Sequence, residues 1–131
     1  MKNVFFIIAI YMSSIANALA NQETDAALSW LKVVDSGQYI ESWQQAAPYF
    51  QEQLSSSAWE QALNQVRAPL GKVISRQVKN SSQHSSLPGA PTGEYIVITT
   101  VASFEHKQSA VETITISKVG NEWRAVGYFI K

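Results

Sequence analysis

Hydrophobic residues in the first half of the chain recur at helical spacing. A first stripe, with steps of three and four residues, consists of Ala27, Trp30, Leu31 and Val34. Residues at these steps lie on one side of a helix, so the pattern predicts an amphipathic helix. We expect Thr24 or Asp25 to cap it, because their side-chain oxygens can accept a free main-chain N–H. Gly37 is expected to end it, because glycine adopts the left-handed conformation most easily.

Two further helical segments are predicted before residue 69. The apolar positions of the second are Tyr39 or Ile40, Trp43, Ala47 and Phe50. Pro48 interrupts this segment and either kinks one helix or opens a further short one. The third segment is expected to begin at Ser57, which forms a capping-box pattern with Glu60. Its expected buried positions are Trp59, Leu63 and Val66.

The second half of the chain alternates between apolar and polar residues, which is typical of strands. The alternating segments are residues 72–79, 94–104, 110–119 and 122–130. Short turns at residues 105–108 and 120–121 indicate that the last three strands form an antiparallel meander. Two phrases rich in proline and glycine, at residues 67–71 and 87–95, mark the change from helices to strands. We therefore expect an α+β domain, in which N-terminal helices pack on a curved antiparallel sheet of about four strands.

The first twenty residues have the features of a cleavable signal peptide. Lys2 supplies a basic start, residues 4–12 an apolar segment, and residues 18–20 the small-x-small cleavage pattern Ala-Leu-Ala. Cleavage is expected before Asn21, which leaves a single domain at residues 21–131. The apolar segment is about half as long as the ~20 residues that a membrane-spanning helix needs, which favours a signal peptide. The alternative is an uncleaved N-terminal anchor. A bacterial periplasmic or secreted location follows from this interpretation.

Charge and cysteine content exclude several classes of partner and chemistry. The chain has ten basic and ten acidic residues and no cysteine. Without a block of like charge, we expect no nucleic-acid partner. Without cysteine there is no disulfide, no thiolate nucleophile and no Cys-ligated metal. His84 and His106 fall in a predicted loop and a predicted turn, so we expect neither a metal site nor a cofactor.

Four charged residues share a strand face with apolar residues if the alternation is regular. The expected groups are Arg76 with Ile74 and Val78, Glu94 with Ile96 and Ile98, Glu112 with Ile114 and Ile116, and Arg124 with Val126 and Tyr128. A charge on an apolar face is costly unless it is paired, so we expect Arg76 to pair with Glu112 or with Glu94. We expect four charged residues either to bind an anionic ligand beside a carboxylate or to form a structural ion pair: Arg67, Arg76, Glu94 and Glu112.

Many spaced residues resemble the bacterial domain of unknown function 4019. They are Leu31, Asp35, Gly37, Tyr39, Trp43, Trp59, the segments 67–71, 75–76 and 87–95, Phe104, Glu112-Thr113, Trp123-Arg124 and Gly127-Tyr128. The Asp-x-Gly-x-Tyr-x-x-x-Trp opening at residues 35–43 also resembles the nuclear transport factor 2-like roll, a cystatin-like α+β architecture. That resemblance implies helices and a bent sheet around a conical pocket, and it covers both enzymes and noncatalytic modules.

The resemblance to ketosteroid-isomerase-like rolls adds weaker candidate site residues. In those enzymes a Tyr hydroxyl and carboxyl groups act on a carbonyl substrate in an apolar cavity. In this chain the weaker candidates with a carboxyl or Tyr hydroxyl group are Asp35, Tyr39, Tyr95 and Tyr128. We expect Asp35 to cap the second helix instead, and Tyr39 to pack with its hydroxyl at the surface.

Two classes of function therefore remain. The preferred interpretation is a noncatalytic exported module that binds a small molecule, a peptide or a partner protein, with homodimerisation through the sheet as a further expectation. The alternative is a small isomerase- or hydrolase-type enzyme that uses carboxylate and Tyr groups. An enzyme requires an acid or base with a strongly shifted pKa in a closed cavity, whereas a module is expected to show a shallow pocket.

Overall fold

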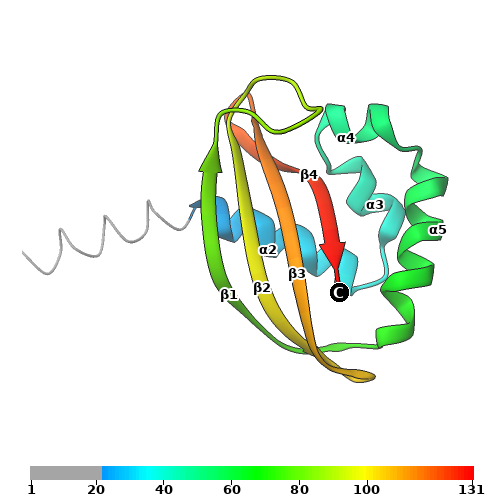
Figure 1. The fold of residues 1–131 in the computed structure, drawn as a ribbon. Coiled ribbons are helices and arrows are strands. Elements are labelled where there is room, and N and C mark those ends of the chain that lie inside the picture. The colour runs from blue at the N-terminus through cyan, green and yellow to red at the C-terminus, as the bar shows by residue number, and fades with distance from the viewer. Residues whose placement is uncertain (1–21) are drawn as a thin grey trace, which may run out of the picture.

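The computed structural model describes residues 22–131, so the predicted signal peptide lies outside the described residues. Helices come first: α2 (Gln22–Asp35), α3 (Tyr39–Gln44), α4 (Pro48–Gln53) and α5 (Ser56–Val66), then a 3₁₀ turn η1 (Ala68–Leu70). Four strands follow: β1 (Val73–His84), β2 (Tyr95–Phe104), β3 (Lys107–Val119) and β4 (Glu122–Ile130). The helices lie on one side of a curved sheet (Figure 1). This confirms the predicted α+β fold, and it is consistent with a nuclear transport factor 2-like roll.

The sheet has the order β1-β2-β3-β4, and every neighbouring pair is antiparallel. The meander expected for the last three strands is thus present. β1 runs to His84, five residues beyond the predicted end at residue 79, so His84 lies on a strand and not in a loop. Polar residues of this edge strand pair with β2, for example Ser81 with Ile98. β1 is largely exposed on both faces, so residues 80–84 show no alternation of apolar and polar positions from which a strand could be predicted.

The main core lies between the concave face of the sheet and the helices. Its largest group of buried side chains is Trp30, Leu31, Val34, Phe50, Trp59, Leu63, Ile96, Ile98, Ile114 and Ile116. The rings of Trp30 and Trp59 stack with centroids 6.2 Å apart, and Phe50 meets Trp59 edge to face at 5.0 Å. Burial of this apolar surface is the main driving force that holds the helices on the sheet. These side chains occupy the space between the helices and the sheet.

The structure settles three helix boundaries, of which two agree with the sequence prediction and one differs. Gly37 follows α2 with a positive φ of 81°, as expected, and Pro48 opens the separate helix α4. The cap of α5 is Ser55, whose hydroxyl accepts a hydrogen bond from the Ala58 N–H at 3.2 Å, so the assignment to Ser57 was wrong by two residues. Val66 is 49% exposed because it comes at the last position of the helix, beyond the covered stripe.

Irregular strand register overturns part of the predicted face assignment. The register of β1 shifts between Val73 and Ser75, which leaves Ile74 68% exposed while Arg76 points inward beside buried Ala102. A second shift, between Thr115 and Ile116 of β3, puts Arg124 opposite Ser117 and away from the face that carries Tyr128. A bulge inserts one residue and so exchanges the two faces of a strand, an effect that regular alternation cannot reveal.

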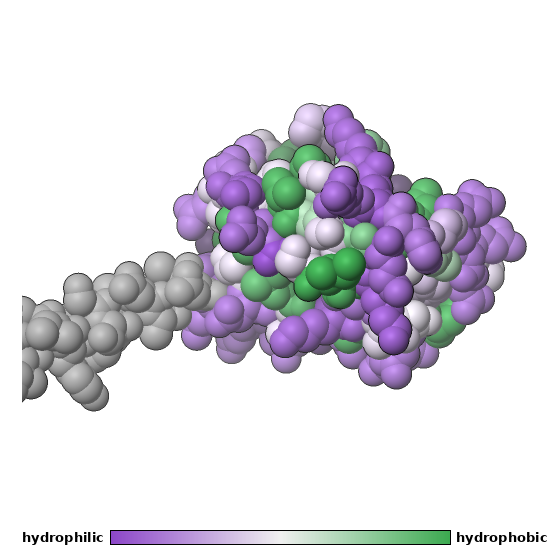
Figure 2. Space-filling view, turned by 90° about the horizontal axis from the view of Figure 1, so that it is seen from below, coloured by the Kyte–Doolittle hydropathy of each residue, from purple (hydrophilic) through white to green (hydrophobic). Residues whose placement is uncertain are grey.

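Some apolar side chains remain exposed. In the described part of the chain they include Val66, Ile74, Val78, Val111 and Phe129. Figure 2 shows hydrophobic residues gathered near the middle of one face, with hydrophilic residues around them. Exposed apolar surface can serve association, and homodimerisation through the sheet stays a prediction. Within residues 22–131, no helix is long and apolar enough to cross a membrane.

Candidate functional site

Glu112 is a fully buried carboxylate in the middle of β3. Its exposed fraction is 0%, and it lies opposite Thr100 of β2, which is also fully buried. Oε1 accepts hydrogen bonds from Arg76 Nε at 2.6 Å and from the Thr100 hydroxyl at 2.8 Å. Oε2 accepts from Arg76 Nη2 at 3.1 Å and from the Tyr128 hydroxyl at 2.5 Å. Glu112 therefore accepts four hydrogen bonds from side chains of the other three strands.

Arg76 connects this carboxylate to the helices. On its other side, Nη1 and Nη2 donate to the two carboxylate oxygens of Asp35 at 2.8 and 2.9 Å. Asp35 is the last residue of α2, and it also accepts from Arg67 Nη2 at 2.8 Å. The expectation that Asp35 caps the next helix is thus wrong, because Gln38 takes the N-cap position of α3 and makes no side-chain cap hydrogen bond.

Arg67 completes the group at the end of α5. Only 2% of this residue is exposed, and its guanidinium lies 4.3 Å from the centroid of the Phe104 ring. Nη1 donates to the main-chain oxygen of Gly71 at 3.0 Å, which ties the helix to the turn before β1. The buried Nε is the one guanidinium nitrogen of Arg67 without a hydrogen-bond partner in the described part of the chain. We call Asp35, Arg67, Arg76, Glu112 and Tyr128 the ion-pair network.

The network is electrically neutral, since its two arginines balance its two carboxylates. Burial by itself would raise the pKa of Asp35, but hydrogen bonds and charge from Arg76 and Arg67 outweigh it and hold the pKa below its ordinary value of 3.8. For Arg76, burial opposes the charge, yet Asp35 and Glu112 raise its pKa. Burial raises the pKa of Tyr128, and the charge of Glu112 raises it further. Asp35, Arg76 and Tyr128 therefore keep one protonation state around neutral pH.

The structure brings five of the eight candidate residues together in this network and leaves three outside it. Arg76 pairs with Glu112, one of its two expected partners. Glu94 instead lies just before β2, exposed, with Oε2 3.9 Å from Lys118 Nζ. Tyr39 packs against the core. Tyr95 is buried and donates to the main-chain oxygen of Pro91 at 2.5 Å.

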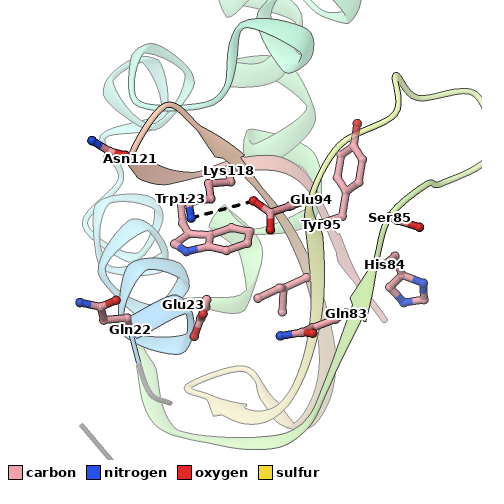
Figure 3. A pocket seen from close by; sticks show the side chains of 11 residues that line it. Gln22, Glu23, Gln83, His84, Ser85, Glu94, Tyr95, Lys118, Asn121 and Trp123 are labelled. Atoms are coloured by element: carbon pink, nitrogen blue, oxygen red, sulfur yellow. Dashed lines mark ion pairs between the residues drawn. The ribbon is translucent and has the colours of Figure 1, made fainter. Parts of the chain in front are cut away.

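An open cleft lies at the other end of α2, and we call it the main cleft. It has a volume of about 630 Å³ and is lined by Gln22, Glu23, Gln83, His84, Ser85, Glu94, Tyr95, Ile96, Lys118, Asn121 and Trp123. These residues come from the first turn of α2 and from strand ends on the same side (Figure 3). Twelve helical steps from Glu23 to Asp35 correspond to about 18 Å, so the main cleft and the ion-pair network are separate.

A second groove of about 420 Å³ lies between α2, the end of α3 and β4. It is lined by Ala26, Ser29, Trp30, Gln44, Gln45, Glu122, Trp123, Arg124 and Ala125. Trp123 lines both the main cleft and this groove. Sequence reasoning assigned no role to Trp123 or Gln83. Only their positions in the sequence could have indicated a role. Trp123 follows a tight turn, and Gln83 falls in a polar stretch between two predicted strands.

Metal binding has no support in the described part of the chain. No group of three or more His, Cys, Asp or Glu side chains there could hold an ion. The two carboxylates of the network already accept guanidinium hydrogen bonds, which leaves them poorly placed as metal ligands.

Comparisons with known proteins agree with the sequence resemblance. No curated protein and no solved structure matches the chain. A family model described as "Protein of unknown function (DUF4019)" matches residues 26–128, which is nearly all of the described domain. The chain therefore belongs to the DUF4019 family.

Proposed function

We propose that this protein is an exported, noncatalytic binding module whose ligand occupies the main cleft. The observation that carries the proposal is the contrast between the two polar sites. The charges of the ion-pair network are matched by partners inside the protein, whereas the main cleft presents polar side chains to solvent. Its volume falls within the range of about 300–1,000 Å³ that is typical of ligand pockets.

The geometry of the network argues against acid–base catalysis. A general acid or base works best when its pKa lies near the operating pH, and the pKa of Asp35 is lowered while that of Tyr128 is raised. The Tyr128 hydroxyl donates to Glu112, so it is not available to polarise a substrate carbonyl. None of the network residues lines the main cleft or the second groove. The ion-pair network is thus better explained as a brace between α2, α5 and the sheet.

The main cleft has the features of a recognition site. Apolar surface from Trp123, Tyr95 and Ile96 lies beside carboxamide, hydroxyl and carboxylate groups. Within residues 22–131, the structure shows no protein hydrogen-bond partner for the side-chain amides of Gln83 and Asn121. Binding sites commonly combine an apolar wall with a few polar groups that orient the ligand.

Ligand retention during purification tests the binding proposal. The full chain, expressed with its own first twenty residues, should be purified from the periplasm and measured by native mass spectrometry. We expect an added mass that is lost on denaturation, and nitrogen-15 NMR shifts on its re-addition at Gln83, Lys118 and Trp123. Shifts confined to Arg76 and Glu112 would refute the assignment of the binding site to the main cleft.

Export has its own test in the same preparation. The first twenty residues support signal cleavage, so the intact mass of the periplasmic protein should begin at Asn21. A protein that keeps Met1 and is recovered from the cytoplasm would contradict the export proposal while leaving the binding proposal untouched.

A further inference from the structure

Trp123 differs from the other three tryptophans in the hydrogen bonding of its indole N–H. The indole nitrogens of Trp30, Trp43 and Trp59 each donate to a protein oxygen, at 2.8, 2.7 and 2.9 Å. For Trp123, the described residues offer no such acceptor. Its ring packs partly against the core, so the indole is held in place while its nitrogen remains available. A tryptophan with an apolar face and an unused donor is suited to bind a ligand.

The indole also occupies a central position between the two binding surfaces. Figure 3 shows the ring projecting into the main cleft, between Glu23 of α2 and the pair formed by Glu94 and Lys118. The same residue lines the second groove. A ligand made of repeated units could therefore contact Trp123 and extend to either side of it.

Carboxamides surround this tryptophan on both sides. Gln22, Gln83 and Asn121 line the main cleft, and Gln44 and Gln45 line the second groove. Each carboxamide offers one acceptor oxygen and two N–H donors in a plane. Such groups can donate to one hydroxyl of a ligand and accept from its neighbour, which matches molecules that carry adjacent hydroxyl groups.

The charges of both surfaces are largely compensated. Lys118 faces Glu94 in the main cleft, and Arg124 Nη2 lies 2.9 Å from Glu122 Oε2 in the second groove. Of the charged groups that line them, Glu23 alone lacks an opposite charge within ion-pair distance in the described chain. A phosphorylated ligand is bound best by several converging cations, whereas each of these surfaces has a single Lys or Arg, which lies beside a carboxylate. The polar lining equally disfavours a lipid.

From these contacts we propose that Trp123 and the surrounding carboxamides bind a neutral saccharide chain. The apolar C–H face of one sugar ring stacks on the indole, and its hydroxyls exchange hydrogen bonds with Gln83, Asn121 and the Trp123 N–H. Neighbouring sugars extend toward Gln44 and Gln45. This inference rests on the proposed function, because it names the ligand class of the same cleft.

The test uses three neutral tetrasaccharides that differ in linkage and substituent: cellotetraose, maltotetraose and tetra-N-acetylchitotetraose. Each is added at up to millimolar concentration to the exported, purified protein, and binding is followed by calorimetry and by the indole N–H signal of Trp123. At least one probe should bind and shift that signal. Gln83→Ala and Trp123→Phe should each weaken binding about threefold to tenfold, as expected for one lost hydrogen bond.

Gln77→Ala is the matched control, because Gln77 is an exposed glutamine on the same strand but does not line the main cleft. It should change the affinity less than twofold. Gln83→Ala is a substitution on an exposed edge strand, so it keeps the test valid if Trp123→Phe proves unstable.

The outcomes separate this inference from the proposed function. If no neutral saccharide shifts the Trp123 signal, but inorganic phosphate, a diamine or the ligand retained from the periplasm does, the saccharide inference is overturned and the binding module stands. If no added compound shifts the NMR signals of residues in the main cleft and no ligand is retained, both the saccharide inference and the binding proposal are overturned. Equal loss of affinity in Gln77→Ala and Gln83→Ala would also reject the assigned contacts.

Discussion

Replacing Arg76 by alanine is the most direct test of how the ion-pair network supports the fold. The substitution removes four hydrogen bonds, two to Asp35 of α2 and two to Glu112 of β3. Asp35 keeps its partner Arg67 and is 13% exposed, so water can replace part of what it loses. Water cannot reach Glu112 in the same way, because its carboxylate is fully buried. It would keep only the hydrogen bonds from the hydroxyls of Thr100 and Tyr128.

The expected cost follows from that uncompensated charge. Removing one partner of a buried ion pair typically costs about 3–5 kcal/mol. The Arg76 side chain is itself 11% exposed, so we expect the lower end, about 3 kcal/mol. For a domain of this size, such a loss corresponds to a fall in melting temperature of roughly 12 °C.

Urea unfolding followed by tryptophan fluorescence measures this free energy of unfolding. Arg124→Ala is the matched control, because Arg124 pairs with Glu122 at the surface and should change stability by about 0.5 kcal/mol or less. The double variant Arg76→Ala with Glu112→Gln should be about 1–2 kcal/mol more stable than Arg76→Ala alone, since it no longer buries an unpaired carboxylate.

Two results would refute this reasoning. One is a loss below about 1 kcal/mol for Arg76→Ala, which would place the ion pair in the weak class of exposed pairs. The other is the absence of rescue by Glu112→Gln, which would show that lost packing and not stranded charge governs the site.

Four further outcomes are expected. Since the folded pKa of Asp35 lies below 3.8, its contribution to stability is present above pH 4 and lost as the pH falls through the folded pKa; Asp35→Asn should flatten that acid limb in a denaturation series. The folded pKa of Tyr128 is raised above 10.0, so stability should fall as the pH rises beyond 10, and Tyr128→Phe should remove that loss. Ser55→Ala should cost about 1 kcal/mol of unfolding free energy by calorimetry while Ser57→Ala costs little, and equal effects would contradict the observed cap. Light scattering should show a dimer at tens of micromolar that Phe129→Ser dissociates, and a monomer at that concentration would count against association through the sheet.

The elements of this fold could be predicted because each leaves a local pattern. The apolar stripe from Ala27 to Val34 reflects the buried side of α2. The alternation in β2 and β3 reflects the buried face of the sheet in the same way. The edge strand β1 was predicted too short because its far half is exposed on both faces and so carries no such record. The cap at Ser55 was misplaced because Ser55 and Ser57 are both plausible N-caps, and the choice depends on where the chain enters the helix.

The candidate site was predictable only in part. Arg76 and Glu112 were identified as costly charges on strands, and the structure pairs them. Asp35 was assigned to a cap because nothing in the spacing indicates that Arg76, which is 41 positions away, comes within 2.8 Å of it. Trp123 and Gln83 drew no attention, because a cleft formed by strand ends and a helix terminus leaves no periodic signal.

By itself, then, the sequence determined the order of helices and strands, the covered faces and the absence of cysteine chemistry, since these depend on residue type and local spacing. The tertiary structure decided which charges meet, which face each bulged strand presents, and where a cleft remains open. The physical reason is that these features arise from register and packing between distant segments. Buried charges must be paired wherever the fold places them, and a cleft remains only where packing between distant segments leaves space.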